Sequence, residues 1–290
     1  MIKYEYLMPA TLEEAIFNFR DHQGDAKYIA GGTELMREIK AGELKLQYLI
    51  SLRHVKEFGQ ITSEEGKLRI GATVTHRDLE LATSLKGKFD GLVDAVSNIG
   101  TVQIRNVATV GGNLCNASPA ADSAPPLLVL DSRVTLAGVD ESRSLPIEEF
   151  FKGVNKTILR DNELLAEIVV PYPDEGTGSA FMKNIRAGAD ISKINCAVLV
   201  KRRDDICKTC RIAFGSVAPT PIRIKTVEAF LKGKKVDEAL IRSAGEMASE
   251  EIKPITDIRS TAEYRKDVSK VIFRDVFYKA WKRAGGDSSK

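Results

Sequence analysis

The sequence lacks the long apolar runs, cysteine frameworks and repeats that mark several protein classes. No segment of its 290 residues approaches the roughly 18 uninterrupted apolar residues that a membrane helix needs. Cys115, Cys196, Cys207 and Cys210 are too few and too scattered for a disulfide framework in a chain of this length. With 43% hydrophobic and 29% charged residues, the composition is that of a globular protein, not a disordered chain or a coiled coil.

Charge is divided unevenly along the chain. Residues 1–177 carry 19 basic and 26 acidic side chains, whereas residues 178–290 carry 24 and 14. This asymmetry indicates two domains, the second of which either faces an acidic partner or presents solvated helix faces. The amino end, MIKYEYLMPATLEEA, has no apolar core of a signal peptide, so we expect a cytoplasmic protein.

The pattern of apolar residues predicts an α+β protein. The first part is a small βαβ-like unit, with strands at 4–6, ending at Ala30 and at 46–51, and with helices that begin at Thr11 and near Thr33. Further elements are expected in the middle of the chain: strands at 67–75, 133–137 and 164–170, and helices near 76–84, 91–98 and 124–130.

The segment 171–179 (PYPDEGTGS) is the clearest linker, because turn residues dominate it. Beyond it, strands near 179–186, 194–202 and 208–217 indicate an antiparallel sheet, and helices follow Pro221. A long last helix is expected to bury one face, formed by Val268, Val271, Ile272 and Val276.

Several familiar catalytic motifs are missing from the sequence. It contains no GxGxxG, GxxxxGK[ST], GxSxG or HExxH. The histidines His22, His54 and His76 show no metal-ligand spacing, and each is expected to be a surface or cap residue. Cys207 and Cys210 form one CxxC beside the charged RRDD, in what is expected to be a tight turn between two strands. We interpret the two cysteines as an incidental pair, because a zinc or iron–sulfur site needs four ligands.

Two glycine-paired turns remain as candidate sites. The first, AGGTEL, joins a strand to a helix, so its amides and a hydroxyl could meet an anion, with the Glu34 carboxylate turned away. The second, TVGGN, is followed by NASPAADS and offers small polar donors, with Asp122 as an acceptor for a ribose hydroxyl. A purely structural turn is the alternative for each, but the two together favour a dinucleotide.

These segments carry a resemblance to a known family. AGGTEL, followed by QIRNVATVGGNLCNASPAADSAP, resembles the FAD-binding subunit or domain of the xanthine dehydrogenase and carbon monoxide dehydrogenase family of molybdenum hydroxylases. PATLEEA, IGATVTHRDLE, FMKNIRAGADIS and RIAFGSVAPTPIR extend the similarity over nearly the whole chain.

The resemblance implies a fold of two subdomains that clasp FAD (the PCMH type), at 1–57 and 58–175, and a third domain at 178–290. The third domain would hold a three-stranded antiparallel sheet with helices. The resemblance also implies a set of FAD-binding residues: Ile29, Ala30, Gly31, Gly32, Thr33, Glu34, Leu35, Ile99, Thr109, Val110, Gly111, Gly112, Asn113, Ser118, Asp122, Lys183, Asp190 and Ile191. Lys183 and the 186–191 loop would approach the flavin ring, and Arg105 is expected to hold a loop. No metal ligand and no acid–base catalyst is expected in this chain.

The resemblance further implies that the chain is one part of an oxidoreductase complex, a dimer of heterotrimers (a heterohexamer). A large subunit would carry a molybdopterin-type molybdenum cofactor, and a small subunit two [2Fe–2S] clusters. FAD in this chain would pass electrons from the clusters to NAD, a quinone or a ferredoxin.

Two other functions stay open at the level of the sequence. A stand-alone FAD-dependent oxidoreductase would turn over without partners. A nucleic-acid-binding module finds little support, because the basic residues are interspersed with acidic ones and few aromatics accompany them.

Overall fold

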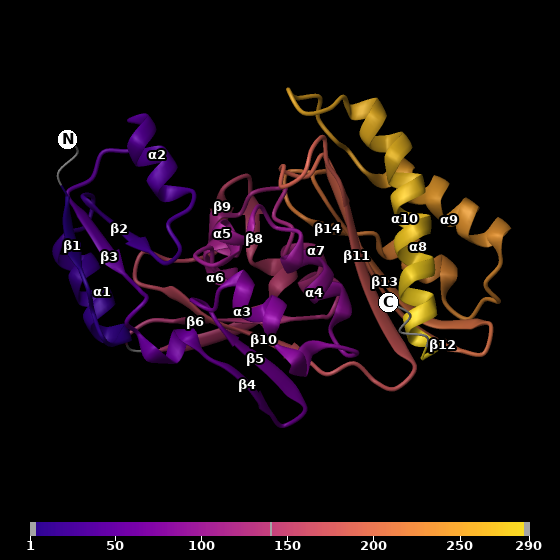
Figure 1. Cartoon of the computed structure of the whole chain (residues 1–290), viewed down its shortest axis with the longest axis horizontal. Coiled ribbons are helices and arrows are strands. Elements are labelled where there is room, and N and C mark those ends of the chain that lie inside the picture. Colours follow the sequence, from indigo (N-terminus) through magenta and orange to yellow (C-terminus); the bar gives the residue numbers. More distant parts are fainter. Residues whose placement is uncertain (1–3, 140, 287–290) are drawn as a thin grey trace.

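A computed structural model describes residues 4–139 and 141–286, arranged around three main sheets that follow one another along the chain (Figure 1). The first sheet lies at one end of the elongated molecule, and the third lies beneath the long C-terminal helices at the other end. The middle sheet and its helices separate them. The predicted α+β fold is therefore confirmed.

The first sheet is parallel and has the order β1-β3-β2. Its strands are β1 (Glu5–Leu7), β2 (Ala26–Ile29) and β3 (Tyr48–Ser51), with helices α1 (Leu12–Asp21) and α2 (Leu35–Ala41). Thr11 caps α1 by accepting a hydrogen bond from the amide of Glu14, as its position before the apolar periodicity predicts. Helix α2 begins two residues later than expected, because Gly32 adopts a φ of +70° and keeps the chain in a turn.

The middle sheet is antiparallel, with the order β4-β5-β10-β6-β7. Its strands are β4 (Ile61–Glu64), β5 (Lys67–Gly71), β6 (Arg133–Ala137), β7 (Ser142–Pro146) and β10 (Leu164–Pro171). The helices of this part are α3 (His76–Leu81), α4 (Asp90–Ser97), α5 (Val102–Arg105), α6 (Val110–Asn116) and α7 (Ala124–Val129). A hairpin of β8 (Phe151–Gly153) and β9 (Lys156–Thr157) and three short 3-10 turns (Lys56–Gly59, Thr83–Leu85 and Ile147–Glu149) complete it.

The third sheet has the order β11-β12-β13-β14. Its strands are β11 (Thr177–Asn184), β12 (Ile194–Arg203), β13 (Ile206–Gly215) and β14 (Ile222–Arg223). Helices α8 (Lys225–Leu231), α9 (Glu238–Glu251) and α10 (Ala262–Ala284) follow. Besides the three strands that were expected, the sheet has the short fourth strand β14.

Strand β12 is buried on both faces. Val198 and Val200 pack into the core beneath α8–α10, whereas Ala197 and Leu199 join the core of the middle part. This double burial explains why residues 196–200 are continuously apolar instead of alternating. The third sheet is thus sandwiched between its own helices and α4 and α7.

Two details of the C-terminal part differ from the sequence interpretation. Val271 is 49% exposed, and Phe273 and Phe277 take the buried positions of α10 beside Ile272. The tight turn lies at residues 204–205, and Cys207 and Cys210 both lie within β13, where their side chains are buried.

Candidate functional site

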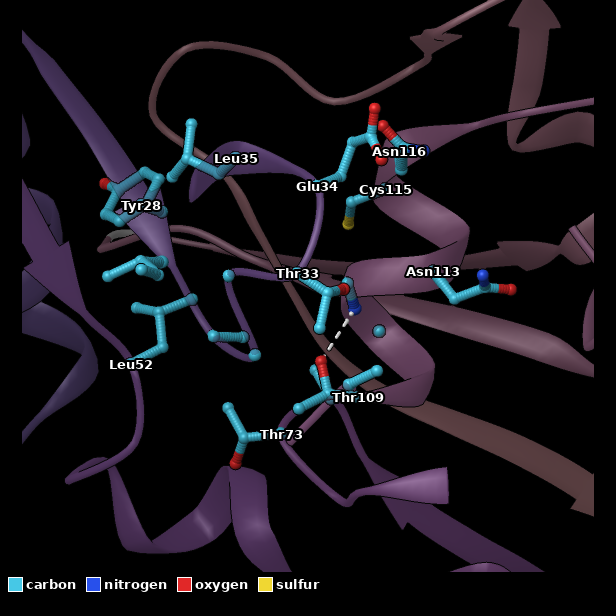
Figure 2. A pocket seen from close by; sticks show the side chains of 18 of the residues that line it. Tyr28, Thr33, Glu34, Leu35, Leu52, Thr73, Thr109, Asn113, Cys115 and Asn116 are labelled. Carbon is cyan, nitrogen blue, oxygen red and sulfur yellow. Dashed lines mark hydrogen bonds between the residues drawn. The ribbon is translucent and has the colours of Figure 1, made fainter. Parts of the chain in front are cut away.

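A cavity of about 480 Å³ lies between the first sheet and the middle part of the molecule. Its walls come from the β2–α2 turn, from residues after β5, and from the segment that leads into α6 (Figure 2). In Figure 2, Thr33 of the first glycine turn and Thr109 of the second lie close to each other near the centre of the view. A volume of this size falls within the range of small-molecule and cofactor sites.

The first glycine turn makes direct backbone contact with the segment just before the second turn. A Cβ atom added at Gly31 would lie 2.8 Å from the Cα atom of Ala108 and would collide with the carbonyl oxygen of Val107. Only glycine permits this approach. The first turn and the segment before the second turn, far apart in sequence, therefore form one wall of the cavity.

The first turn presents free backbone donors. Among the described residues, no hydrogen bond is donated by the amides of Gly32, Thr33, Glu34 and Leu35. The Glu34 carboxylate is paired with the Arg37 guanidinium at 2.8 Å, and Glu34 also lines the cavity. This pairing, together with the one to Glu43, raises the pKa of Arg37. The turn therefore has four amides without a partner among the described residues at the wall of the cavity, and its own carboxylate is paired.

The second turn differs from the expectation, because its amides already have partners within the protein. Val110 and Gly111 donate to the carbonyl oxygens of Val74 and Ala72, both at 3.0 Å. The amide of Gly112 donates to Thr109 Oγ1, also at 3.0 Å. This turn therefore supplies a close-packed surface of small side chains, not a set of free amide donors.

His76 is the residue that the sequence interpretation placed wrongly. It was expected at the surface or in a cap, but it is 0% exposed and lines the cavity. Thr75 caps α3 in a capping box with Asp78, so His76 occupies the first helical position. The His76 amide donates to the carbonyl oxygen of Ala108 at 3.0 Å, which joins the start of α3 to the segment before the second turn.

The imidazole of His76 is neutral at physiological pH. Burial, and to a smaller degree the nearby charge of Arg105, lower the pKa of His76 to about 4. Neither ring nitrogen has a hydrogen-bond partner among the described residues. The ring therefore carries one N–H donor and one acceptor nitrogen, both buried and without a partner among the described residues.

Arg105 holds a loop, as predicted. Its guanidinium donates to the carbonyl oxygens of Ile99 and Gly100 at 3.2 and 3.3 Å. It also pairs with Glu80 at 2.9 Å, and this contact, together with Arg77, lowers the pKa of that carboxyl group against the opposing effect of burial. The loop held in this way carries Ile99, whose side chain lines the cavity.

Asp122 lies in a buried polar cluster outside the cavity lining. Its Oδ2 atom is 2.9 Å from Lys183 Nζ, and its Oδ1 atom accepts hydrogen bonds from Ser192 at 2.5 Å and from Asn195 at 2.7 Å. Lys183 also donates to the carbonyl oxygen of Asp190. The cluster fastens the segment after the second turn to β11, β12 and the loop between them.

The predicted site residues therefore fall into two groups. Those that line the cavity are Ile29, Ala30, Gly31, Gly32, Thr33, Glu34, Leu35, Ile99, Thr109, Gly111, Gly112 and Asn113. Those that are not part of its lining are Val110, Ser118, Asp122, Lys183, Asp190 and Ile191. Val110 is fully buried in the core, since it lies on the inner side of α6.

Within residues 4–139 and 141–286, no three histidine, cysteine, aspartate or glutamate side chains lie close enough together to hold a metal ion.

Cys115 lines the cavity, and burial raises the pKa of its thiol to about 12. Among the helices of the same residues, none is both long and apolar enough to cross a membrane.

Comparison with known families matches both parts of the chain. The family described as "FAD binding domain in molybdopterin dehydrogenase" matches residues 2–173, and the "CO dehydrogenase flavoprotein C-terminal domain" matches residues 179–280. The chain belongs to this flavoprotein family. The resemblance inferred from the two glycine turns is thereby confirmed, and the molecule is an oxidoreductase flavoprotein with an FAD-binding domain.

Relatives of this flavoprotein share its full length. It is 32% identical over 284 residues to the xanthine dehydrogenase FAD-binding subunit of Escherichia coli O157:H7, covering 97% of each chain. It is 28% identical to the carbon monoxide dehydrogenase medium chain of Hydrogenophaga pseudoflava, covering 97% of this chain and 98% of that one.

Solved structures agree with this assignment. A chain of carbon monoxide dehydrogenase from Hydrogenophaga pseudoflava superposes with a TM-score of 0.93 at 29% identity, covering 97% of this chain and 98% of that one. A chain of quinoline 2-oxidoreductase from Pseudomonas putida 86 gives a TM-score of 0.92 at 28% identity, with the same coverage of both chains.

Proposed function

We propose that this chain is the FAD-carrying electron-transfer subunit of a molybdenum hydroxylase complex. It accepts electrons from two [2Fe–2S] clusters of a small partner subunit and passes them through FAD to an external acceptor. A large subunit with a molybdopterin-type cofactor carries out the organic reaction. The observation that carries the proposal is the convergence of both glycine turns on one cavity.

The residues of the cavity fit an FAD molecule. The free amides from Gly32 to Leu35 supply donors for a diphosphate, and the Arg37 contact neutralises the only carboxylate in that turn. Gly111 and Gly112 line the opposite wall, and the absence of a side chain at Gly111 lets this segment pack tightly against Ala72.

The full set of residues proposed to surround FAD is the one inferred from the sequence. Lys183, Asp190 and Ile191 belong to the set as residues near the flavin ring. For Asp122, the contacts with Lys183, Ser192 and Asn195 support a role in holding the 185–193 loop, and its hydrogen bond to the ribose stays a prediction.

The bound flavin supplies the redox chemistry, since it accepts and releases electrons one or two at a time. This chain contributes binding and orientation. The first turn holds the diphosphate, and Arg105 fixes the loop of Ile99 against the cofactor. The ion pair of Asp122 and Lys183 sets the position of the loop from the C-terminal part. No residue of the chain acts on the organic substrate in this scheme.

The partners follow from the same assignment. Relatives named as medium chains and FAD-binding subunits belong to enzymes of several chains, which supports a large and a small partner here. We propose a dimer of heterotrimers in the cytoplasm, without nucleic acid, with NAD, a quinone or a ferredoxin as the electron acceptor.

Expression of the chain alone and with its neighbouring reading frames tests the proposal. We expect the purified chain to bind one FAD, to show flavin absorption, and to have at most diaphorase activity. Co-expression should yield a complex that contains molybdenum and iron as well as flavin. Steady turnover by the isolated chain with a simple donor would instead establish the stand-alone FAD-dependent oxidoreductase.

A further inference from the structure

Arg53 carries a positive charge that no carboxylate of the described residues neutralises. The side chain is exposed, and its Nε atom donates to the carbonyl oxygen of Ala30 at 3.1 Å. Within residues 4–139 and 141–286, the guanidinium makes no other hydrogen bond and no ion pair. Its remaining N–H groups and its charge are therefore available to a ligand.

The hydrogen bond to Ala30 places this guanidinium at the first glycine turn. Ala30 follows β2 and Arg53 follows β3, and these two strands are parallel neighbours. In sheets of parallel strands, ligands bind beyond the carboxyl ends of the strands, which is where both residues lie. Ala30 and Leu52 line the cavity, whereas Arg53 lies outside the lining and acts on the cavity from beside its wall.

The charge of Arg53 lies close enough to the free amides to act on an anion there. Gly32, whose amide is the first of the four without a partner among the described residues, is two residues from Ala30. The Cα atoms of Ala30 and Gly32 are therefore no more than about 7.6 Å apart, since consecutive Cα atoms are about 3.8 Å apart. The Debye length at physiological ionic strength is about 8 Å, so salt screens the charge only in part over this distance.

The cavity lining itself does not favour an anion. Its described part contains three carboxylates and one ammonium group: Glu34, Glu38, Glu163 and Lys27. Arg37 and Arg143 pair with two of these carboxylates, at 2.8 and 2.7 Å, and the remaining carboxylate and the ammonium group have equal and opposite charges. The lining and its partners thus sum to no net charge, and Arg53 adds a positive charge beside the turn.

We propose that the Arg53 guanidinium, fixed on the Ala30 carbonyl, supplies the positive charge that strengthens binding of the FAD diphosphate at the first glycine turn. This inference rests on the proposed function, because it requires FAD in the cavity. It goes further by assigning a residue outside the lining and outside both glycine turns. One charge that acts on a doubly charged diphosphate at about 8 Å corresponds to about a threefold to tenfold change in affinity at low salt.

Titration of the full-length apoprotein with FAD at low salt, followed by quenching of flavin fluorescence, tests the proposal. We expect Arg53→Gln, which keeps an N–H donor for the Ala30 carbonyl, to weaken FAD binding about threefold to tenfold. Arg53→Lys keeps the charge and should bind FAD within about twofold of the wild type. Arg203→Gln is the matched control, because Arg203 is exposed and ends β12, outside the cavity lining. Its affinity should equal that of the wild type.

The salt dependence of binding separates an effect of charge from a structural effect. Salt screens exposed charges, so the dissociation constants of Arg53→Gln and the wild type should converge as NaCl rises from about 20 to about 500 mM. A ratio that salt does not change, or an equal loss in Arg53→Lys, would give Arg53 a structural role and overturn the inference. Wild-type affinity of Arg53→Gln at low salt would also overturn it. A wild-type chain that does not bind FAD would instead overturn the proposed function.

Discussion

Lys183 Nζ lies 2.9 Å from Asp122 Oδ2, and the two side chains are only 5% and 8% exposed. Asp122 comes from the segment after the second glycine turn, and Lys183 from β11 of the third sheet. Ser192 and Asn195 satisfy the other carboxylate oxygen. The pair therefore joins two parts of the molecule through a buried, fully hydrogen-bonded carboxylate.

Removing one partner of this pair should destabilise the protein strongly. Asp122→Asn leaves the Lys183 ammonium buried without a counter-charge, so we expect a loss of about 3–5 kcal/mol in the free energy of unfolding. Lys183→Met should have a comparable effect. The double variant should lose less than the sum of the two, which urea denaturation of the three variants measures. Additive losses would show that the charges do not interact.

Gly31→Ala tests the contact between the first glycine turn and the segment before the second turn. The added methyl group would press on Ala108 and on the carbonyl of Val107, so the two segments must separate. We expect a loss of about 1–3 kcal/mol in stability and weaker binding of FAD. Gly59→Ala is the control, because its Cβ would lie 3.7 Å from Thr73 Oγ1, an ordinary contact distance. Equal behaviour of the two variants would contradict a tight junction at Gly31.

The burial of His76 predicts a dependence of stability on pH. Its pKa falls from the usual 6.5 to about 4 on folding, so the unfolded chain takes up a proton before the folded protein does. The stabilising contribution is complete above pH 6.5 and is lost as the pH falls toward 4. Between pH 7 and pH 5, the wild type should lose about 2 kcal/mol more stability than His76→Leu. Parallel losses in both proteins, measured with urea, would contradict this account.

Cys115 should react slowly with alkylating reagents, although its side chain is only half-buried at the cavity wall. Burial raises the pKa of the thiol to about 12, so the thiolate fraction at pH 8 is on the order of 10⁻⁴. Iodoacetamide labelling followed by peptide mass spectrometry should find the Cys115 peptide modified far more slowly in the native protein than in urea. Similar rates in both conditions would disagree with a raised pKa.

Local sequence determines much of the fold. Thr11 and Thr75 each start a helix as caps, because a hydroxyl before an apolar periodicity can accept from the third amide. The glycine pairs at 31–32 and 111–112 mark the cavity, and at Gly31 and Gly111 only glycine tolerates the backbone approach found there. These features depend on neighbours in the chain, and they could be predicted without a structure.

The missed features depend on packing between distant segments. Nothing in the residues beside His76 shows that Ala108 will bury it. The amides of the second turn seemed free for a ligand, but they bond to Val74 and Ala72, which lie more than 30 residues earlier in the chain. Val271 fits the helical period of α10 but is exposed, because α10 packs on the third sheet with the neighbouring face, which carries Phe273. Contacts between segments that are distant in the sequence determine which side chains are buried and which amides are already hydrogen-bonded.

Strand β12 contributes side chains to two hydrophobic cores at once. The middle part of the molecule and the C-terminal part are therefore expected to unfold together. Val198 and Val200 face α8–α10, while Ala197 and Leu199 face the middle part. A protease that cut the connection at residues 172–176 would leave two fragments held together, because separation would expose both sets of apolar atoms to water. The molecule should accordingly melt in a single cooperative step, nicked or whole.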